Sequence, residues 1–91
     1  MAAVQRNGDA NTGGGTISST AQSTVYANSK LISVNGSTVT THGVSPNVHA
    51  GVTTANGSST VFAGGIAINR TGDADSCTHT RTGGSGDVFV G

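Results

Sequence analysis

The sequence predicts a short-stranded, all-β domain, and two features of the chain carry that prediction. Glycines and β-branched Thr and Val residues are spread throughout, and no apolar stripe recurs at the 3.6-residue period of a helix. Short clusters at residues 23–27 and 59–63 have the composition of strands. Asn-Gly and Gly-Gly pairs at 35–36, 56–57, 64–65 and 83–84 bound such clusters and favour tight turns.

Composition and charge limit the classes of function. Only 33% of the 91 residues are apolar, three are aromatic, and Gly, Ser and Thr together supply 40 of them. Four basic residues balance four acidic ones, so the chain has no electrostatic reason to stay expanded. The same balance leaves no basic patch for nucleic acid or an anionic membrane, and we expect no nucleic-acid partner.

The size of the chain predicts one domain, residues 1–91. A domain this small needs a stabilising element besides its apolar core. The first residues lack the apolar run of a signal peptide, so we expect no secretory leader, and no stretch reaches a membrane-spanning length. Cys77 is the only cysteine, which excludes an internal disulfide. A small polar domain without disulfides usually depends on a metal or an obligate partner.

Three copies of one pattern are found when the chain is treated as circular. The units are 23–58, 59–85, and 86–91 continued by 1–22, and their first fifteen residues align without a gap. The three aromatic residues, Tyr26, Phe62 and Phe89, occupy the same repeat position. This register predicts pseudo-threefold symmetry with the first and last strands paired. The alternative, a linear solenoid fragment, would leave its sheet edges exposed.

Four residues in the variable segments between the repeated strands are candidate metal ligands: His42, His49, Cys77 and His79. Cys77 and His79 are two apart, so on an extended strand their side chains would share one face. Three imidazoles and one thiolate suit tetrahedral zinc, with iron as an alternative. The competing interpretation is a set of exposed histidines and a buried cysteine.

Other motifs give no candidate catalytic residue. The three glycines at 13–15 lack the lysine of a phosphate-binding loop, and a flexible turn explains them. Asp9 and Asp73 each follow an Arg-x-Gly sequence, which favours structural pairing with Arg6 and Arg70 over a catalytic pair of carboxylates. We therefore expect that the protein is not an enzyme.

Segments 59–65, 67–73 and 84–91 resemble the repeats of PAAR-domain proteins, and residues 2–9 look like the same repeat. The resemblance implies a conical domain that sits on the blunt end of a trimeric β-helical spike, with a metal near its apex. It places zinc on the four ligands named above. It also implies that Tyr26, Phe62 and Phe89 lie at the spike-binding base or in the core beside it.

The function that follows from the resemblance is mechanical. Such a protein is the structural tip of a contractile injection machine and sharpens the spike for envelope piercing. One tip would cap each spike trimer, remain a monomer by itself, and touch the target membrane only transiently. Ala-Ala-Val-Gln-Arg at 2–6 departs from the family's Pro-Ala-Ala-Arg motif. A bacteriophage baseplate and virion tail tip, a type VI secretion tip that is cytoplasmic before ejection, and a bacteriocin all stay open.

Two rival functions come from other classes. A small zinc hydrolase would need an open coordination position for water, which Cys77 beside His79 would fill. A Thr-rich β-solenoid that binds a surface such as ice or a glycan is suggested by Thr78, Thr80 and Thr82 in alternation. That rival requires a flat array of several rungs, and only one segment supplies such a run.

Overall fold

The structure is a computed structural model that describes residues 2–44, 47–49, 51–77 and 79–91. Among these residues the regular structure is all β, and no helix is present that could cross a membrane. The strands contain two or three residues each. They are β1 (Ala2–Ala3), β2 (Ile17–Ser19), β3 (Tyr26–Ala27), β4 (Lys30–Leu31), β5 (Thr38–Val39), β6 (His42–Val44), β7 (Asn47–His49), β8 (Val52–Thr53), β9 (Phe62–Ala63), β10 (Ile66–Ala67) and β11 (Phe89–Val90).

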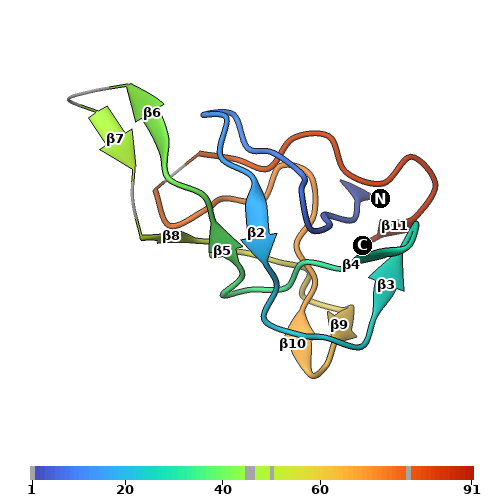
Figure 1. Cartoon of the computed structure of the whole chain (residues 1–91). Helices are drawn as coiled ribbons and strands as arrows, with labels where there is room; N and C mark the ends of the chain where they lie inside the picture. Colours follow the sequence, from blue (N-terminus) through green and yellow to red (C-terminus); the bar gives the residue numbers. More distant parts are fainter. Residues whose placement is uncertain (1, 45–46, 50, 78) are drawn as a thin grey trace.

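Three antiparallel strand pairs join corresponding positions of the three repeats. The pairs β3–β4, β9–β10 and β1–β11 match Tyr26 with Leu31, Phe62 with Ala67, and Phe89 with Ala3. The first two are hairpins, whereas β1–β11 joins the two ends of the chain (Figure 1). The circular alignment predicts this pairing of the first and last strands.

A closed cycle of three backbone hydrogen bonds ties together the segments that follow these strand pairs. The N–H of Gln5 donates to the carbonyl of Asn69 (3.0 Å), that of Ser33 to Gln5 (2.9 Å), and that of Asn69 to Ser33 (2.9 Å). All three residues are fully buried. Flanking bridges recur in the same way, joining Val4 to Arg70, Arg6 to Ile32, and Val34 to Ile68. Each segment therefore satisfies the backbone groups of the other two.

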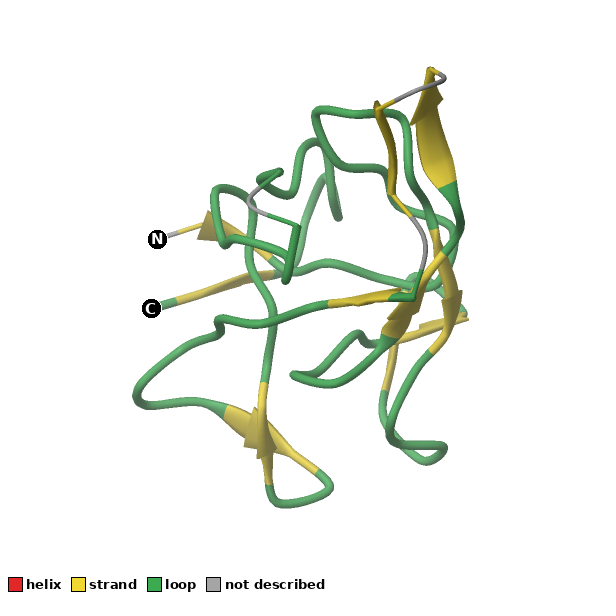
Figure 2. Cartoon of the chain, turned by 90° about the vertical axis from the view of Figure 1, so that its left-hand side faces the viewer, coloured by secondary structure: helices red, strands yellow, loops and turns green. Residues whose placement is uncertain are grey.

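The remaining strands build the other end of the molecule. β2, β5 and β8 form a three-stranded antiparallel sheet, and β6 and β7 form a hairpin. Figures 1 and 2 show the β6–β7 hairpin projecting from one end, while the β9–β10 hairpin and the chain ends lie away from it. The molecule is elongated, with extents of 36 × 23 × 22 Å.

The apolar core lies beside the three strand pairs and is small. Its buried members are Val4, Ala27, Ile32, Val34, Ala63 and Ile68. Within the described part of the chain, nine buried residues are apolar and thirteen are polar or charged. Hydrogen bonds must therefore satisfy an unusually polar interior.

The predicted strands at 23–27 and 59–63 are shorter than expected, because side chains take over backbone donors. The Oε1 atom of Gln22 accepts hydrogen bonds from the N–H groups of Thr24 and Val25, both at 2.8 Å. Ser58 Oγ does the same for the two corresponding residues of the next repeat. Those N–H groups are not available to a sheet. Within the two predicted strands, only the residues of β3 and β9 therefore pair with a neighbouring strand.

The two Arg-x-Gly-Asp sequences form ion pairs, as predicted. Arg6 Nε lies 2.9 Å from Asp9 Oδ2, and Arg70 Nη2 lies 2.9 Å from Asp73 Oδ1. Each carboxylate also accepts the backbone N–H of its arginine. These aspartates stabilise a turn.

The two-residue turns of the hairpins require left-handed backbone. Gly64 and Gly65 have φ values of 60° and 80°, whereas Asn28 and Ser29 adopt 54° and 65° in the corresponding turn. Positive φ at both central residues is the requirement of a type I′ turn, in which Asn-Gly is strongly preferred. Ser29 is thus the residue least suited to its backbone.

Replacing Ser29 with glycine should stabilise the protein. The left-handed conformation costs a non-glycine residue about 1–2 kcal/mol, and the greater freedom of glycine in the unfolded chain offsets part of the gain. We expect a net gain of about 1 kcal/mol, or a rise in melting temperature of roughly 4–8 °C. The reciprocal Gly65→Ser variant is the control and should melt lower. Unchanged or lower stability of Ser29→Gly would contradict the left-handed turn.

Candidate metal centre

Three of the four predicted ligands meet at one point. The ligand atoms of His42, Cys77 and His79 lie within 4.8 Å of one another. His42 Nε2 is 2.9 Å from His79 Nδ1, and Cys77 Sγ is 3.5 Å from the former and 3.6 Å from the latter. His42 is buried and the other two are half-buried. This group could hold a metal ion.

The distances suit a small tetrahedral ion. Zinc bonds of about 2.0–2.1 Å to nitrogen and 2.3 Å to sulfur place tetrahedral N and S ligands roughly 3.6 Å apart. The two observed S···N distances agree with that value. The two nitrogens would separate from 2.9 Å by a few tenths of an ångström to admit the ion. The donor set therefore fits zinc with little movement.

The ring of His42 is oriented by a backbone carbonyl. Its Nδ1 lies 2.8 Å from the carbonyl oxygen of Thr40, directly after β5. Because a carbonyl can only accept, Nδ1 carries the proton in this bond, and Nε2 is left to face the cluster. Such a hydrogen bond on the far nitrogen is the usual support of a metal-ligating histidine.

The fourth predicted ligand, His49, is placed by its backbone alone. It lies in β7 directly opposite His42 in β6, and its side chain is outside the described part of the structure. Thr78, which the Thr-rich alternative invoked, is also outside the described residues.

Cys77 and His79 approach each other differently from the prediction. The spacing would place both side chains on one face if the backbone were an extended strand, but Ser76 and Cys77 lie in a turn. The N–H of Asp75 donates to the carbonyl of His79 at 2.7 Å, which closes this loop. The two side chains meet because the chain turns, and the alternation of a strand is not involved.

The glycines at 13–15 are part of the site, and sequence reasoning missed them. A Cβ atom on Gly13 would lie 2.2 Å from His79 Cε1, and one on Gly15 would lie 2.3 Å from His42 Nδ1. The backbone at Gly13 and Gly15 therefore packs directly against the imidazoles, and at these two positions only glycine leaves room for them. A triglycine in the sequence is a signal of close approach as well as of flexibility.

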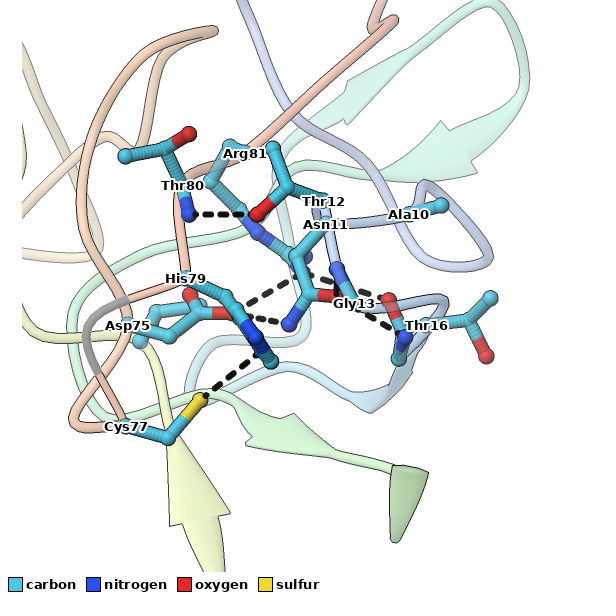
Figure 3. A network of polar contacts seen from close by, with 12 residues as sticks. Ala10, Asn11, Thr12, Gly13, Thr16, Asp75, Cys77, His79, Thr80 and Arg81 are labelled. Atoms are coloured by element: carbon cyan, nitrogen blue, oxygen red, sulfur yellow. Dashed lines mark hydrogen bonds and ion pairs between the residues drawn. The ribbon is translucent and has the colours of Figure 1, made fainter. Parts of the chain in front are cut away.

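A buried ion pair lies beside the cluster (Figure 3). Arg81 Nη2 is 3.0 Å from Asp75 Oδ2, and both side chains are fully inaccessible. Burial lowers the pKa of the Arg81 guanidinium from its ordinary value, while the Asp75 carboxylate opposes this shift. No sequence motif marked this pair.

The three aromatic residues are far more exposed than a core would allow. Tyr26, Phe62 and Phe89 are 60%, 56% and 46% exposed, and they are the large exposed apolar residues of the described chain. The valines beside them, Val25, Val61 and Val88, pack against the apolar core. In each repeat, the valine that precedes the strand thus packs inward, and the aromatic residue that begins the strand is exposed.

No protein-family model matches the chain, and no curated protein matches it significantly. The resemblance to PAAR-domain proteins stays a prediction.

The metal centre predicts about one zinc ion per chain in protein purified without added metal or chelator. Structural zinc contributes roughly 10–16 kcal/mol of apparent binding free energy in small domains, which is large for so small a core. Cys77→Ser and His42→Ala should therefore lose the metal and melt at a much lower temperature. Metal analysis and thermal melting measure the two effects.

A chelator provides the matched control for these variants. It should lower the melting temperature of the parent protein and leave that of Cys77→Ser unchanged. Variants that lose the metal but melt like the parent would show that the metal does not stabilise the fold.

Proposed function

We propose that this protein is the structural tip of a contractile injection machine and caps the blunt end of a trimeric β-helical spike. The observation that carries the proposal is the threefold recurrence of an exposed aromatic on equivalent strand pairs. Tyr26, Phe62 and Phe89 occupy the same register position and are all exposed. The end of a homotrimer offers three identical surfaces, and a single chain with three similar faces can meet all of them.

The cycle of hydrogen bonds through Gln5, Ser33 and Asn69 supports a pseudo-threefold axis for this chain. Such an axis could coincide with the axis of the spike. A single tip then satisfies three spike chains, and the tip has no reason to trimerise by itself. The molecule is elongated with two nearly equal short dimensions, as a cone would be.

Zinc has a mechanical role in this proposal. We take His49 as the fourth ligand, because directly opposite residues of an antiparallel pair share a face of the sheet and His49 is opposite His42. A centre with four protein ligands is closed to water and stabilises the fold, whereas a catalytic zinc keeps an open position. The ion would stiffen the apex during envelope piercing, with only transient contact to the target membrane.

The assembly can be tested by searching the neighbouring reading frames for a trimeric β-helical spike protein and coexpressing it with this chain. Native mass spectrometry of the purified complex should find one tip for three spike chains, and the isolated tip should be monomeric. Three tips for three spike chains, or a stable trimer of the tip alone, would contradict the symmetry-matching proposal.

The aromatic residues should supply much of the affinity. Burial of one such side chain contributes about 1.5–3 kcal/mol, so Phe62→Ser should weaken the complex roughly 10- to 100-fold. Thr38→Ala, an exposed change on the β2–β5–β8 sheet, is the control and should leave binding unchanged. Equal affinity of the two variants for the spike would show that the aromatic residues do not lie in the interface.

A further inference from the structure

We propose that Asn11 is a positioning residue of the metal centre, and that it fixes the backbone at residues 13–15 as a rigid wall against the two imidazoles. The inference rests on the metal centre of the proposed function and is independent of docking to a spike. It assigns a role to a buried side chain, an ion pair and a glycine segment that the ligand set alone leaves unexplained.

The amide of Asn11 is held at both ends. Its Oδ1 accepts hydrogen bonds from the N–H groups of Gly13 (2.9 Å) and Gly15 (2.8 Å). Two backbone donors identify that atom as the oxygen, so Nδ2 must be the atom that faces Asp75 Oδ2 at 2.8 Å. The same Nδ2 lies 3.5 Å from His42 Nε2, the ligand atom. One buried amide therefore contacts the wall and a metal ligand together.

The buried ion pair holds this arrangement in place. Asp75 Oδ2 accepts from Asn11 and also pairs with Arg81. Arg81 in turn donates to the carbonyl oxygen of Gly15 and to that of Asp9, both at 3.3 Å. The Gly15 carbonyl also accepts the N–H of Asn11 at 2.8 Å. Gly15 cannot move away from His42 without breaking its bond to a buried charge, which is costly, and Gly13 is tied to the same network through Asn11.

The wall leaves no space for a side chain. A Cβ on Gly15 would meet His42 Nδ1 at 2.3 Å and Cε1 at 2.8 Å. A Cβ on Gly13 would meet His79 Cε1 at 2.2 Å and Nδ1 at 2.4 Å. Because the wall is fixed, the imidazole is the group that must move, and its ligand nitrogen then shifts relative to the other ligand atoms.

The variants Gly13→Ala, Gly15→Ala and Asn11→Asp test this inference. Asn11→Asp keeps an oxygen that can accept the N–H groups of Gly13 and Gly15, but it removes the N–H donor and places a second carboxylate beside Asp75. Loss of a group that orients a metal ligand typically weakens metal binding by about 10- to 100-fold, and Asn11 orients the imidazoles through the wall at residues 13–15 and not through the ligating Nε2 atom of His42. We expect each variant to bind zinc at least about tenfold more weakly than the parent, as measured by competition with a chromophoric chelator.

Gly86→Ala is the matched control, since no atom lies within 4 Å of its added Cβ and its φ is not left-handed. It should keep the zinc affinity of the parent. The absorption spectrum of the cobalt(II)-loaded protein gives a second readout, because the ligand-field bands report coordination geometry and a general loss of stability does not shift them. Gly13→Ala, Gly15→Ala and Asn11→Asp should each change that spectrum, and Gly86→Ala should not.

Parental zinc affinity and an unchanged cobalt spectrum in the wall variants would overturn the inference, even if their melting temperatures fall. If Gly15→Ala does not fold, Gly13→Ala and Asn11→Asp decide the result in the same way. A parent protein that binds no zinc would instead contradict the metal centre itself. Failure to bind a spike would leave the outcome of this experiment untouched.

Discussion

The fold depends on the cycle of backbone hydrogen bonds that links Gln5, Ser33 and Asn69. These residues come from the beginning, the middle and the last third of the chain, and each donates to one neighbour and accepts from the other. A buried backbone group without a partner costs about 1–3 kcal/mol, so detaching any one segment exposes the other two to that penalty. Strands of two or three residues are sufficient because the segments close on one another and leave no long edge.

The two ends of the molecule are stabilised differently: one end carries the three strand pairs, and the other carries the candidate metal centre. Apolar side chains, among them Val4, Ile32 and Ile68, gather beside the strand pairs. Farther along, the buried residues include Arg81 and Asp75, and burial of an ion pair stabilises a fold weakly at best. A bound metal is the interaction that can compensate there. The cluster of His42, Cys77 and His79 lies outside the apolar cluster beside the strand pairs, and among the described residues only Ile17, Val39 and Val52 add buried apolar side chains in the β2–β5–β8 sheet.

The features that could be predicted from the sequence are those that a local residue pattern or an internal repeat indicates. The shared position of the three aromatics anticipated the pairing of β1 with β11. Histidine and cysteine confined to the variable segments anticipated the cluster, because few other roles bring these residue types together. For His49, the predicted fourth ligand, the structure gives only the backbone register opposite His42.

Other features could not be predicted because they arise from contacts between distant segments. Asn11 and the glycines beside it acquire their role only when residues 75 and 81 fold against them. Gln22 and Ser58 occupy equivalent positions and accept the same backbone donors, yet their chemical difference hides that equivalence. Arg81 would be taken for a solvated surface residue until its carboxylate partner is known.

Native-state amide hydrogen exchange on the zinc-loaded protein tests the closed cycle most directly. The amides of Gln5, Ser33 and Asn69 should be among the slowest in the chain and should exchange with one common free energy, because none of the three bonds can open alone. A Gln5 amide that exchanges much faster than the other two would show that the N-terminal segment detaches separately. That result would contradict a fold closed through its own ends.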